Sequence, residues 1–251
     1  MLSIYSGYDP RYLTRAVAAG RENYYLSAVA EHGEPPGVWT GAGCRELGLE
    51  VGSVVDGPVL ERLYEEFIDP RDPAGMRTLG RAPSEFAAGR EAGEERLARL
   101  LAAEPDASGE RRDELAMRVL GERRAAVYFF DATFSVPKSV SLLHASFQVR
   151  AQQARRQGRA GEAGAWDAHA RAVWAAVMTA NQVMLDYLQR EAGYSRAGYH
   201  SAHSGRFVDA HEWVVASFAQ HTSRDADPQL HVHNAILNRV LREDPLGVAA
   251  G

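Results

Sequence analysis

The sequence contains only one cysteine and only one lysine, Cys44 and Lys138, among its 251 residues. A single cysteine excludes an intrachain disulfide framework and favours a reducing compartment such as the cytoplasm. No apolar run approaches the roughly 20 residues that a membrane-spanning helix needs, and the N-terminus lacks the basic-then-apolar layout of a secretion signal. We therefore expect a cytoplasmic protein without membrane insertion.

The chain also has no excess of positive charge, since its formal net charge is −5. Residues 61–122 hold 15 Asp or Glu against 10 Arg, whereas the rest of the chain holds 18 acids against 18 bases. The acidity therefore belongs to one segment, which is rich in Arg, Glu, Ala, Pro and Gly and has weak helical periodicity. We interpret residues 61–122 as an acidic helical or mobile insertion within one domain that spans residues 1–251.

The apolar pattern outside that segment predicts both helices and strands. We predict strands at 2–5, 125–134, 213–219 and 230–240, and helices at 11–31, 135–147 and 166–190. The last two strands flank a polar turn at 222–228 and should form an antiparallel hairpin. Ser135 suits the N-cap and Pro137 the first turn of the helix that follows the second strand. The predicted fold class is α+β, with an antiparallel central sheet flanked by helices.

The most specific local signal is a pair of histidines two residues apart, His231 and His233, in the last predicted strand. Side chains two apart in a strand project to the same face, so the two imidazoles should lie side by side. His221, across the predicted hairpin, is the candidate third ligand. Three protein ligands with open positions are typical of a catalytic metal site. The alternative is an incidental pair that binds no metal.

Two charged residues, Asp131 and Lys138, stand out in the sequence. Asp131 is the only charged residue in the apolar strand 125–134, and a buried carboxylate is costly unless a partner compensates it. A metal-bound histidine, a reacting hydroxyl or a loop amide would do so. Lys138 is the only lysine among 28 basic residues, and its compact ammonium suits a phosphate contact. An ordinary surface lysine is the alternative.

A tyrosine pair, Tyr24 and Tyr25, lies in the predicted helix 11–31. By packing alone these side chains would belong to the core face of an amphipathic helix. Tyrosine is a poor nucleophile at its usual pKa near 10. Catalysis by either residue would therefore need an adjacent base or a metal-polarised electrophile.

Taken together, these motifs resemble the conjugative relaxases of the MobF type, which belong to the HUH endonuclease superfamily. The matching segments occur in the family's order and are Tyr24-Tyr25, Trp39–Gly43, Leu47–Leu49, Asp131–Ser141, His221–Arg224 and Asp227–His233. The resemblance implies the relaxase palm fold. It also implies nicking and rejoining of single-stranded DNA at a plasmid transfer origin through a 5′-phosphotyrosyl intermediate.

The resemblance implies a role for each residue outside the histidine cluster. Tyr24 or Tyr25 would attack the phosphate, and Asp131 would orient the metal site or take the proton. Lys138 and Arg224 would contact DNA phosphates. The implied partners are single-stranded DNA of a transfer origin and other transfer proteins. Such relaxases usually continue into a helicase region, so we expect this relaxase domain to be incomplete at its C-terminus.

The implied metal site departs from the family pattern at one position. His221, His231 and His233 would hold one divalent ion, with Mn, Mg, Zn, Ni and Co as candidates. In relatives the first histidine often stands one residue earlier, where this chain has Gln220. Neighbouring strand residues face opposite ways, so His221 can replace it only in a locally bulged or rotated hairpin. Gln220 as a weak oxygen ligand is the alternative.

Three other functions remain open at this stage. A rolling-circle replication initiator shares the His-x-His site, but its tyrosine follows the histidines, whereas the last tyrosine here is Tyr199. A metallohydrolase would use the same ligands with water as its nucleophile. A non-catalytic origin-binding remnant would fit the altered first ligand. It would also fit Val17-Ala18, which stands where many relatives carry an earlier tyrosine pair.

Overall fold

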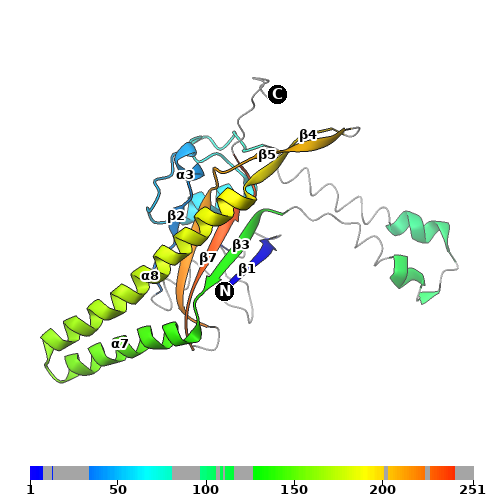
Figure 1. Cartoon of the computed structure of the whole chain (residues 1–251). Helices are drawn as coiled ribbons and strands as arrows, with labels where there is room; N and C mark the ends of the chain where they lie inside the picture. Colours follow the sequence, from blue (N-terminus) through cyan, green and yellow to red (C-terminus); the bar gives the residue numbers. More distant parts are fainter. Residues whose placement is uncertain are drawn as a thin grey trace.

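The centre of the molecule is a five-stranded antiparallel sheet in the order β1-β3-β7-β6-β2 (Figure 1). The computed structural model describes residues 1–7, 13, 34–80, 97–105, 108–109, 111–115, 127–200, 203–223 and 227–240. The strands are β1 (Leu2–Gly7), β2 (Val38–Thr40), β3 (Phe129–Ser135), β6 (Val215–Thr222) and β7 (Pro228–Leu237). The α+β prediction is confirmed, and β2 is the strand of this sheet that the sequence pattern did not predict.

A second, two-stranded sheet pairs β4 (Tyr194–His200) with β5 (His203–Asp209). The sequence analysis did not predict this hairpin. Its two segments contain only scattered apolar residues among Ser, Arg, Gly and His, so neither shows the alternation that marks a half-buried strand.

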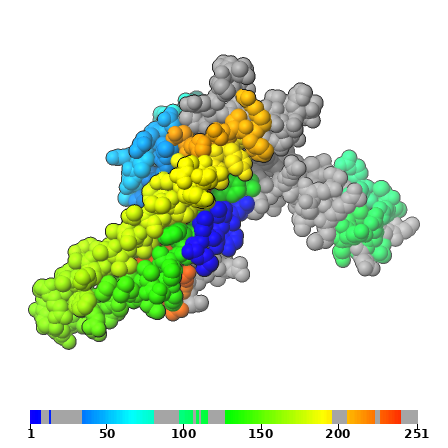
Figure 2. All heavy atoms as spheres, in the orientation of Figure 1, coloured from blue at the N-terminus to red at the C-terminus, as the bar shows by residue number. Residues whose placement is uncertain are grey.

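Two long helices, α7 (Lys138–Arg156) and α8 (Ala160–Ala192), pack against each other and continue past the end of the sheet (Figures 1 and 2). Both are longer than predicted: α7 continues through the Ala- and Gln-rich residues 148–156, and α8 begins in the Ala- and Gly-rich residues 160–165, neither of which has an apolar stripe. The N-cap prediction was wrong: Ser135 ends β3, and Pro137 occupies the cap position. In the described part of the chain, no helix has the combined length and apolarity of a membrane span.

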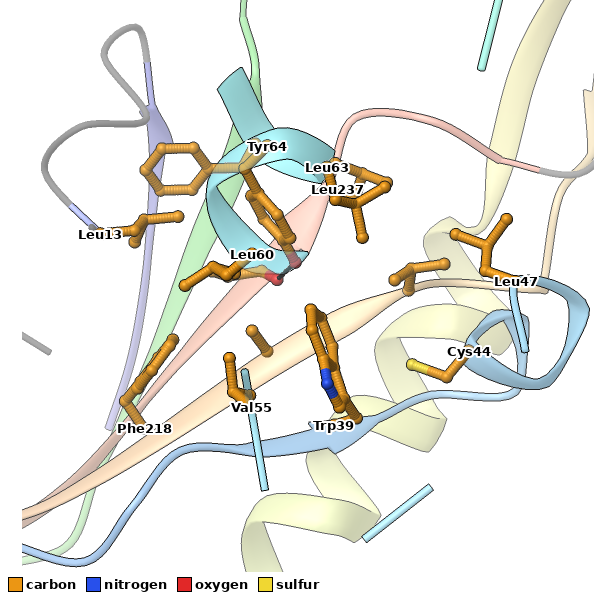
Figure 3. Packing of buried hydrophobic residues seen from close by; sticks show 14 of the residues in the cluster. Leu13, Trp39, Cys44, Leu47, Val55, Leu60, Leu63, Tyr64, Phe218 and Leu237 are labelled. Atoms are coloured by element: carbon orange, nitrogen blue, oxygen red, sulfur yellow. Dashed lines mark hydrogen bonds between the residues drawn. The ribbon is translucent and has the colours of Figure 1, made fainter. Parts of the chain in front are cut away.

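Successive side chains of a strand point to opposite faces, and buried apolar residues lie on both faces of this sheet. One face carries Ala132, Val215 and Ile236 and packs against Leu188 of α8. We call this the helix face. The opposite face carries the main core, whose sheet residues are Phe129, Ala216, Phe218, Ala235 and Leu237 (Figure 3). We call this the site face, for the histidines described below.

The core of the site face is closed by α3 (Gly43–Glu46), α4 (Gly57–Glu61) and the π-helical turn η1 (Arg62–Glu66). Leu63, Tyr64 and Phe67 are almost fully buried there, and the Tyr64 hydroxyl donates to the Ala235 carbonyl at 2.6 Å. The start of the predicted insertion 61–122 thus belongs to the core. Within the rest of that segment, residues 97–103 and 111–115 are helical.

A buried amide network ties the helix face to α8. Asn234 of β7 exchanges hydrogen bonds of 2.8 and 3.1 Å with Asn181 of α8. Asn234 also donates to the Ala132 carbonyl at 2.8 Å and accepts from the Ser217 hydroxyl at 2.7 Å. Since every partner is buried and hydrogen-bonded, this network fixes the position of α8 relative to three strands.

The glycine-rich segment after β2 lies against the start of β6. Gly41 has φ +89°, and a Cβ at this position would lie 2.3 Å from the Trp213 carbonyl oxygen. The Gly43 N–H donates to that same oxygen at 3.0 Å. Only glycine fits both the backbone conformation and the close approach at residue 41.

Candidate metal centre

The register of β3, β7 and β6 brings the predicted polar residues together on the site face. Thr133 pairs with His233, and His231 pairs with Gln220 of β6. Directly paired residues project to the same face, and Asp131, two residues before Thr133, joins them. The imidazole centroids of His231 and His233 lie 5.0 Å apart. The side-by-side arrangement expected from the His-x-His spacing is therefore present.

Hydrogen bonds define the tautomer of both imidazoles. Nδ1 of His231 lies 2.9 Å from the Gln229 carbonyl oxygen, and Nδ1 of His233 lies 2.9 Å from Oδ2 of Asp131. A carbonyl and a carboxylate only accept, so Nδ1 is the donor in each imidazole, and in the neutral form the lone pair is on Nε2. Metal-ligating histidines are oriented by this kind of outer hydrogen bond.

His231 is also kept neutral by its surroundings. Burial lowers the pKa of the His231 imidazole, and this outweighs the rise caused by the hydrogen bond to the Gln229 carbonyl; the neighbouring His233 adds a smaller lowering. A metal binds the neutral imidazole, so a lowered pKa keeps the ligand form populated toward mildly acidic pH.

Asp131 has the compensating partners that its place in an apolar strand requires. Its side chain is 13% exposed. One oxygen accepts from Nδ1–H of His233, and the other accepts from the Thr133 hydroxyl at 3.2 Å. The carboxylate is thus positioned to orient His233, and its charge favours a cation on the far side of that imidazole.

The two candidates for the third ligand lie on opposite faces. Gln220 is on the site face beside His231, whereas the His221 ring stacks on Trp174 of α8 at a centroid distance of 4.4 Å. His221 Nδ1 also lies 2.5 Å from the Glu34 carboxylate. Within the described residues, no three His, Cys, Asp or Glu side chains converge as a metal-ligand set. The geometry therefore favours the amide Gln220 as the third protein group.

Glu34 is the residue of this region that the sequence analysis missed. It lies just after the predicted helix 11–31, in a segment for which the sequence pattern predicted no site. The Glu34 residue is 8% exposed. Burial alone would raise the pKa of the Glu34 carboxyl, but hydrogen bonds from His221 outweigh burial and hold that pKa below its usual value. No local pattern marks such a residue, because its partner is 187 positions away.

Lys138 begins α7, three residues after Ser135, which pairs with His231. It therefore lies at the same end of the sheet as the histidines. Its Nζ is 3.4 Å from Oδ2 of Asp227, and both side chains are largely exposed. Tyr24, Tyr25 and Arg224, the other predicted site residues, lie outside the described residues.

The family model of the TrwC relaxases matches residues 7–248 of the chain. The chain belongs to the TrwC relaxase family. The match spans the tyrosine pair, Asp131 and the histidine segment, and it confirms the resemblance that the sequence motifs indicated.

Solved structures of the conjugative relaxase TrwC in complex with oriT DNA also match. The metal-bound structure is 23% identical with a TM-score of 0.48, and the match covers 97% of this chain and 59% of that chain. The copper-bound structure is 20% identical with a TM-score of 0.46 and the same coverages, 97% and 59%. This chain thus spans less than two thirds of the matched TrwC chains. No curated protein sequence matches it.

Proposed function

We propose that this TrwC-family chain nicks and rejoins single-stranded DNA at a plasmid transfer origin, as a metal-dependent tyrosine transesterase. The observation that carries the proposal is the pair His231 and His233, each with its Nδ1 proton bound and its Nε2 lone pair as the coordinating atom. Asp131 supplies a negative charge next to this pair. The family match is the second support.

The residues on the site face fit a divalent cation. His231 and His233 would hold it through Nε2, and Gln220 would supply an amide oxygen beside them. His221 would first have to leave Glu34 and Trp174 to reach the same place. Imidazole ligands favour Mn, Co, Ni or Zn over Mg. When bound, the cation would polarise the scissile phosphate as a Lewis acid.

The proposed chemistry is a transesterification at phosphorus. The hydroxyl oxygen of Tyr24 or Tyr25 forms a bond to phosphorus and loses its proton, while the bond to the 3′-oxygen breaks and that oxygen is protonated. Asp131 holds His233 in its ligating orientation, and Lys138 and Arg224 offset phosphate charge. The number of phosphoester bonds is unchanged, so the reverse reaction reseals the strand without a nucleotide cofactor.

We place this activity in the cytoplasm, with single-stranded origin DNA, other transfer proteins and a helicase region as partners. The single cysteine fits a reducing compartment, because Cys44 is a buried free thiol in the core and contacts the Thr40 carbonyl oxygen at 2.9 Å.

The test is covalent capture of DNA. The protein is incubated with Mn²⁺ and a library of single-stranded oligonucleotides that carry a randomised centre and a 3′ fluorophore, followed by denaturing gel analysis. A 5′-phosphotyrosyl link retains the 3′-side fragment, so a fluorescent protein band is expected. The band should disappear in a Tyr24→Phe, Tyr25→Phe double variant and persist in Tyr187→Phe, a control on the exposed side of α8.

The same experiment separates the rival functions. A water-using hydrolase would cut the library without forming an adduct, and the tyrosine double variant would cut equally well. A non-catalytic remnant would shift the oligonucleotides in a native gel but cut none of them. An adduct that survives in the double variant would move the nucleophile to another residue of the chain.

A further inference from the structure

The pairing of β6 and β7 changes register just beyond the proposed metal site. Gln220 pairs with His231, but the next pair is Thr222 with Pro228. One residue of β6, His221, therefore stands opposite two residues of β7. A slip of the pairing by one residue at this point would exchange the faces of Gln220 and His221.

Glu34 binds β6 at this position. The His221 N–H lies 2.9 and 3.0 Å from the two Glu34 carboxylate oxygens, and the His221 Nδ1–H and Thr222 hydroxyl donate to the same carboxylate. Strand β2 pairs with β6 only as far as Ser217. Beyond Ser217, Glu34 serves as the acceptor that a neighbouring strand would otherwise provide.

The irregularity is held from two other sides as well. The His221 ring stacks on Trp174 of α8 and on His144 of α7, with ring centroids 4.4 and 5.5 Å apart. On β7, the Leu230 N–H donates to the buried Ser141 hydroxyl of α7 at 2.9 Å. The His221 N–H of β6 and the Leu230 N–H of β7 are thus both bound by side chains next to the register shift.

From these contacts we infer that Glu34 is a positioning residue, which fixes the end of β6 in the register that presents Gln220 to His231 and keeps His221 on the helix face. The inference rests on the proposed function, because it names the third protein group of the proposed metal site. It explains how a chain with glutamine at position 220 and histidine at 221 uses the glutamine.

The first test measures Co²⁺ and Mn²⁺ binding by calorimetry in the absence of DNA. Gln220→His should tighten binding about 10-fold or more, because a neutral imidazole replaces an amide at a position already aimed at the site. Combining Glu34→Gln with Gln220→His should remove most of this gain in metal affinity. An amide in place of the Glu34 carboxylate cannot accept all the hydrogen bonds that His221 donates. The two effects should therefore be non-additive.

Three matched variants serve as controls. Glu50→Gln removes the same charge from an exposed residue and should change neither the binding nor the gain. Gln220→Ala should weaken binding more than His221→Phe, which keeps an aromatic ring against Trp174. The opposite ranking of these two variants, with His221→Phe losing the cation, would overturn the inference.

A second readout needs no metal. Hydrogen exchange of the His221 amide should be faster in Glu34→Gln than in the wild type and in Glu50→Gln, while exchange in α8 stays unchanged. If neither wild type nor Gln220→His binds either cation, the proposed metal site fails, and the exchange result alone decides the role of Glu34. If the His221 amide is then equally protected in Glu34→Gln and in the wild type, the positioning role of Glu34 is overturned. If Glu34→Gln does not fold, the ranking of Gln220→Ala against His221→Phe decides.

Discussion

The two faces of the β6–β7 pair both carry histidine and other polar side chains, but they use them differently. On the helix face, the polar groups of His221, Asn234 and Ser217 are bound to Glu34, to Asn181 and to each other. On the site face, His231 and His233 are bound through Nδ1, and the proposed cation would bind at Nε2. Polar residues on one face stabilise the fold, whereas those on the other are oriented for a ligand.

The difference between the two faces is tested most strongly by alanine substitutions of His233 and Asn234, which are neighbours in β7 and lie on opposite faces. His233→Ala should reduce adduct formation and metal affinity by more than about 100-fold, beyond the range for losing only an outer partner of a ligand. The free energy of unfolding should fall by about 1–2 kcal/mol, because Asp131 loses its bond from His233 but keeps the one from the Thr133 hydroxyl. His211→Ala, at a half-exposed histidine outside the main sheet, is the control. Unchanged metal affinity in His233→Ala would remove this residue from the site.

The complementary variant on the helix face is Asn234→Ala. It leaves the Asn181 amide, the Ser217 hydroxyl and the Ala132 carbonyl without their shared partner in a buried environment. The free energy of unfolding should fall by about 2–4 kcal/mol, measured by urea denaturation. Metal affinity of the folded protein should change by less than about 3-fold. A larger effect on metal than on folding would contradict the division between the faces.

The next effect concerns the partner of His233. Asp131→Asn keeps the size of the side chain but removes its charge and weakens its hold on Nδ1–H. Metal affinity should fall by about 10–100-fold, as measured by calorimetry. Thr133→Val removes the hydroxyl that donates to Asp131 and also lies 3.1 Å from Nδ1 of His233, but it keeps the carboxylate, so it should have a smaller effect. Equal losses in both variants would argue against a special role for the carboxylate.

A smaller effect is expected at Lys138. Lys138→Ala should weaken binding of single-stranded DNA a few-fold and reduce the magnitude of the salt slope by about 0.7 for one lost phosphate contact. Stability should change by at most about 1 kcal/mol, because the pair with Asp227 is exposed. Lys138→Arg is the charge-preserving control. A salt slope identical to that of the wild type would exclude a phosphate contact.

The smallest effect is a pH dependence of folding from the helix face. Burial, and then the nearby His221, lowers the pKa of the His144 imidazole. Below its usual pKa the unfolded chain binds more protons than the folded one, so stability is full above that pKa and declines as pH falls. Urea denaturation at about pH 7.5 and about pH 5.5 should show this decline, less steeply in His144→Phe. An equal slope in both proteins would exclude His144 as a source.

The strands that carry the site were predictable from the sequence because alternation is a local signal. The period of two put His231 and His233 on one face, and the apolar run around Asp131 marked β3. The length of α7 and α8 was underestimated because their buried side chains near the helix junction are alanines, Ala151, Ala154 and Ala163, which do not form a recognisable apolar stripe among the polar and glycine residues around them. The three residues of β2 were too few for any pattern.

The part of the site that could not be predicted depends on contacts between distant segments. The choice between Gln220 and His221 depends on a register shift that begins past Gln220, and spacing alone cannot place such a shift. Glu34 gains its role only from its contact with His221 across the edge of the sheet. Local patterns identify candidate ligands, whereas the tertiary structure decides which of them share a face.

The most direct test of the two-face account is anomalous diffraction from crystals grown with Mn²⁺ or Co²⁺. We predict one anomalous peak on the site face, about 2.0–2.2 Å from Nε2 of both His231 and His233, with Gln220 as the nearest third protein side chain. A peak bound by His221 on the helix face, or none near His231 and His233, would contradict the account.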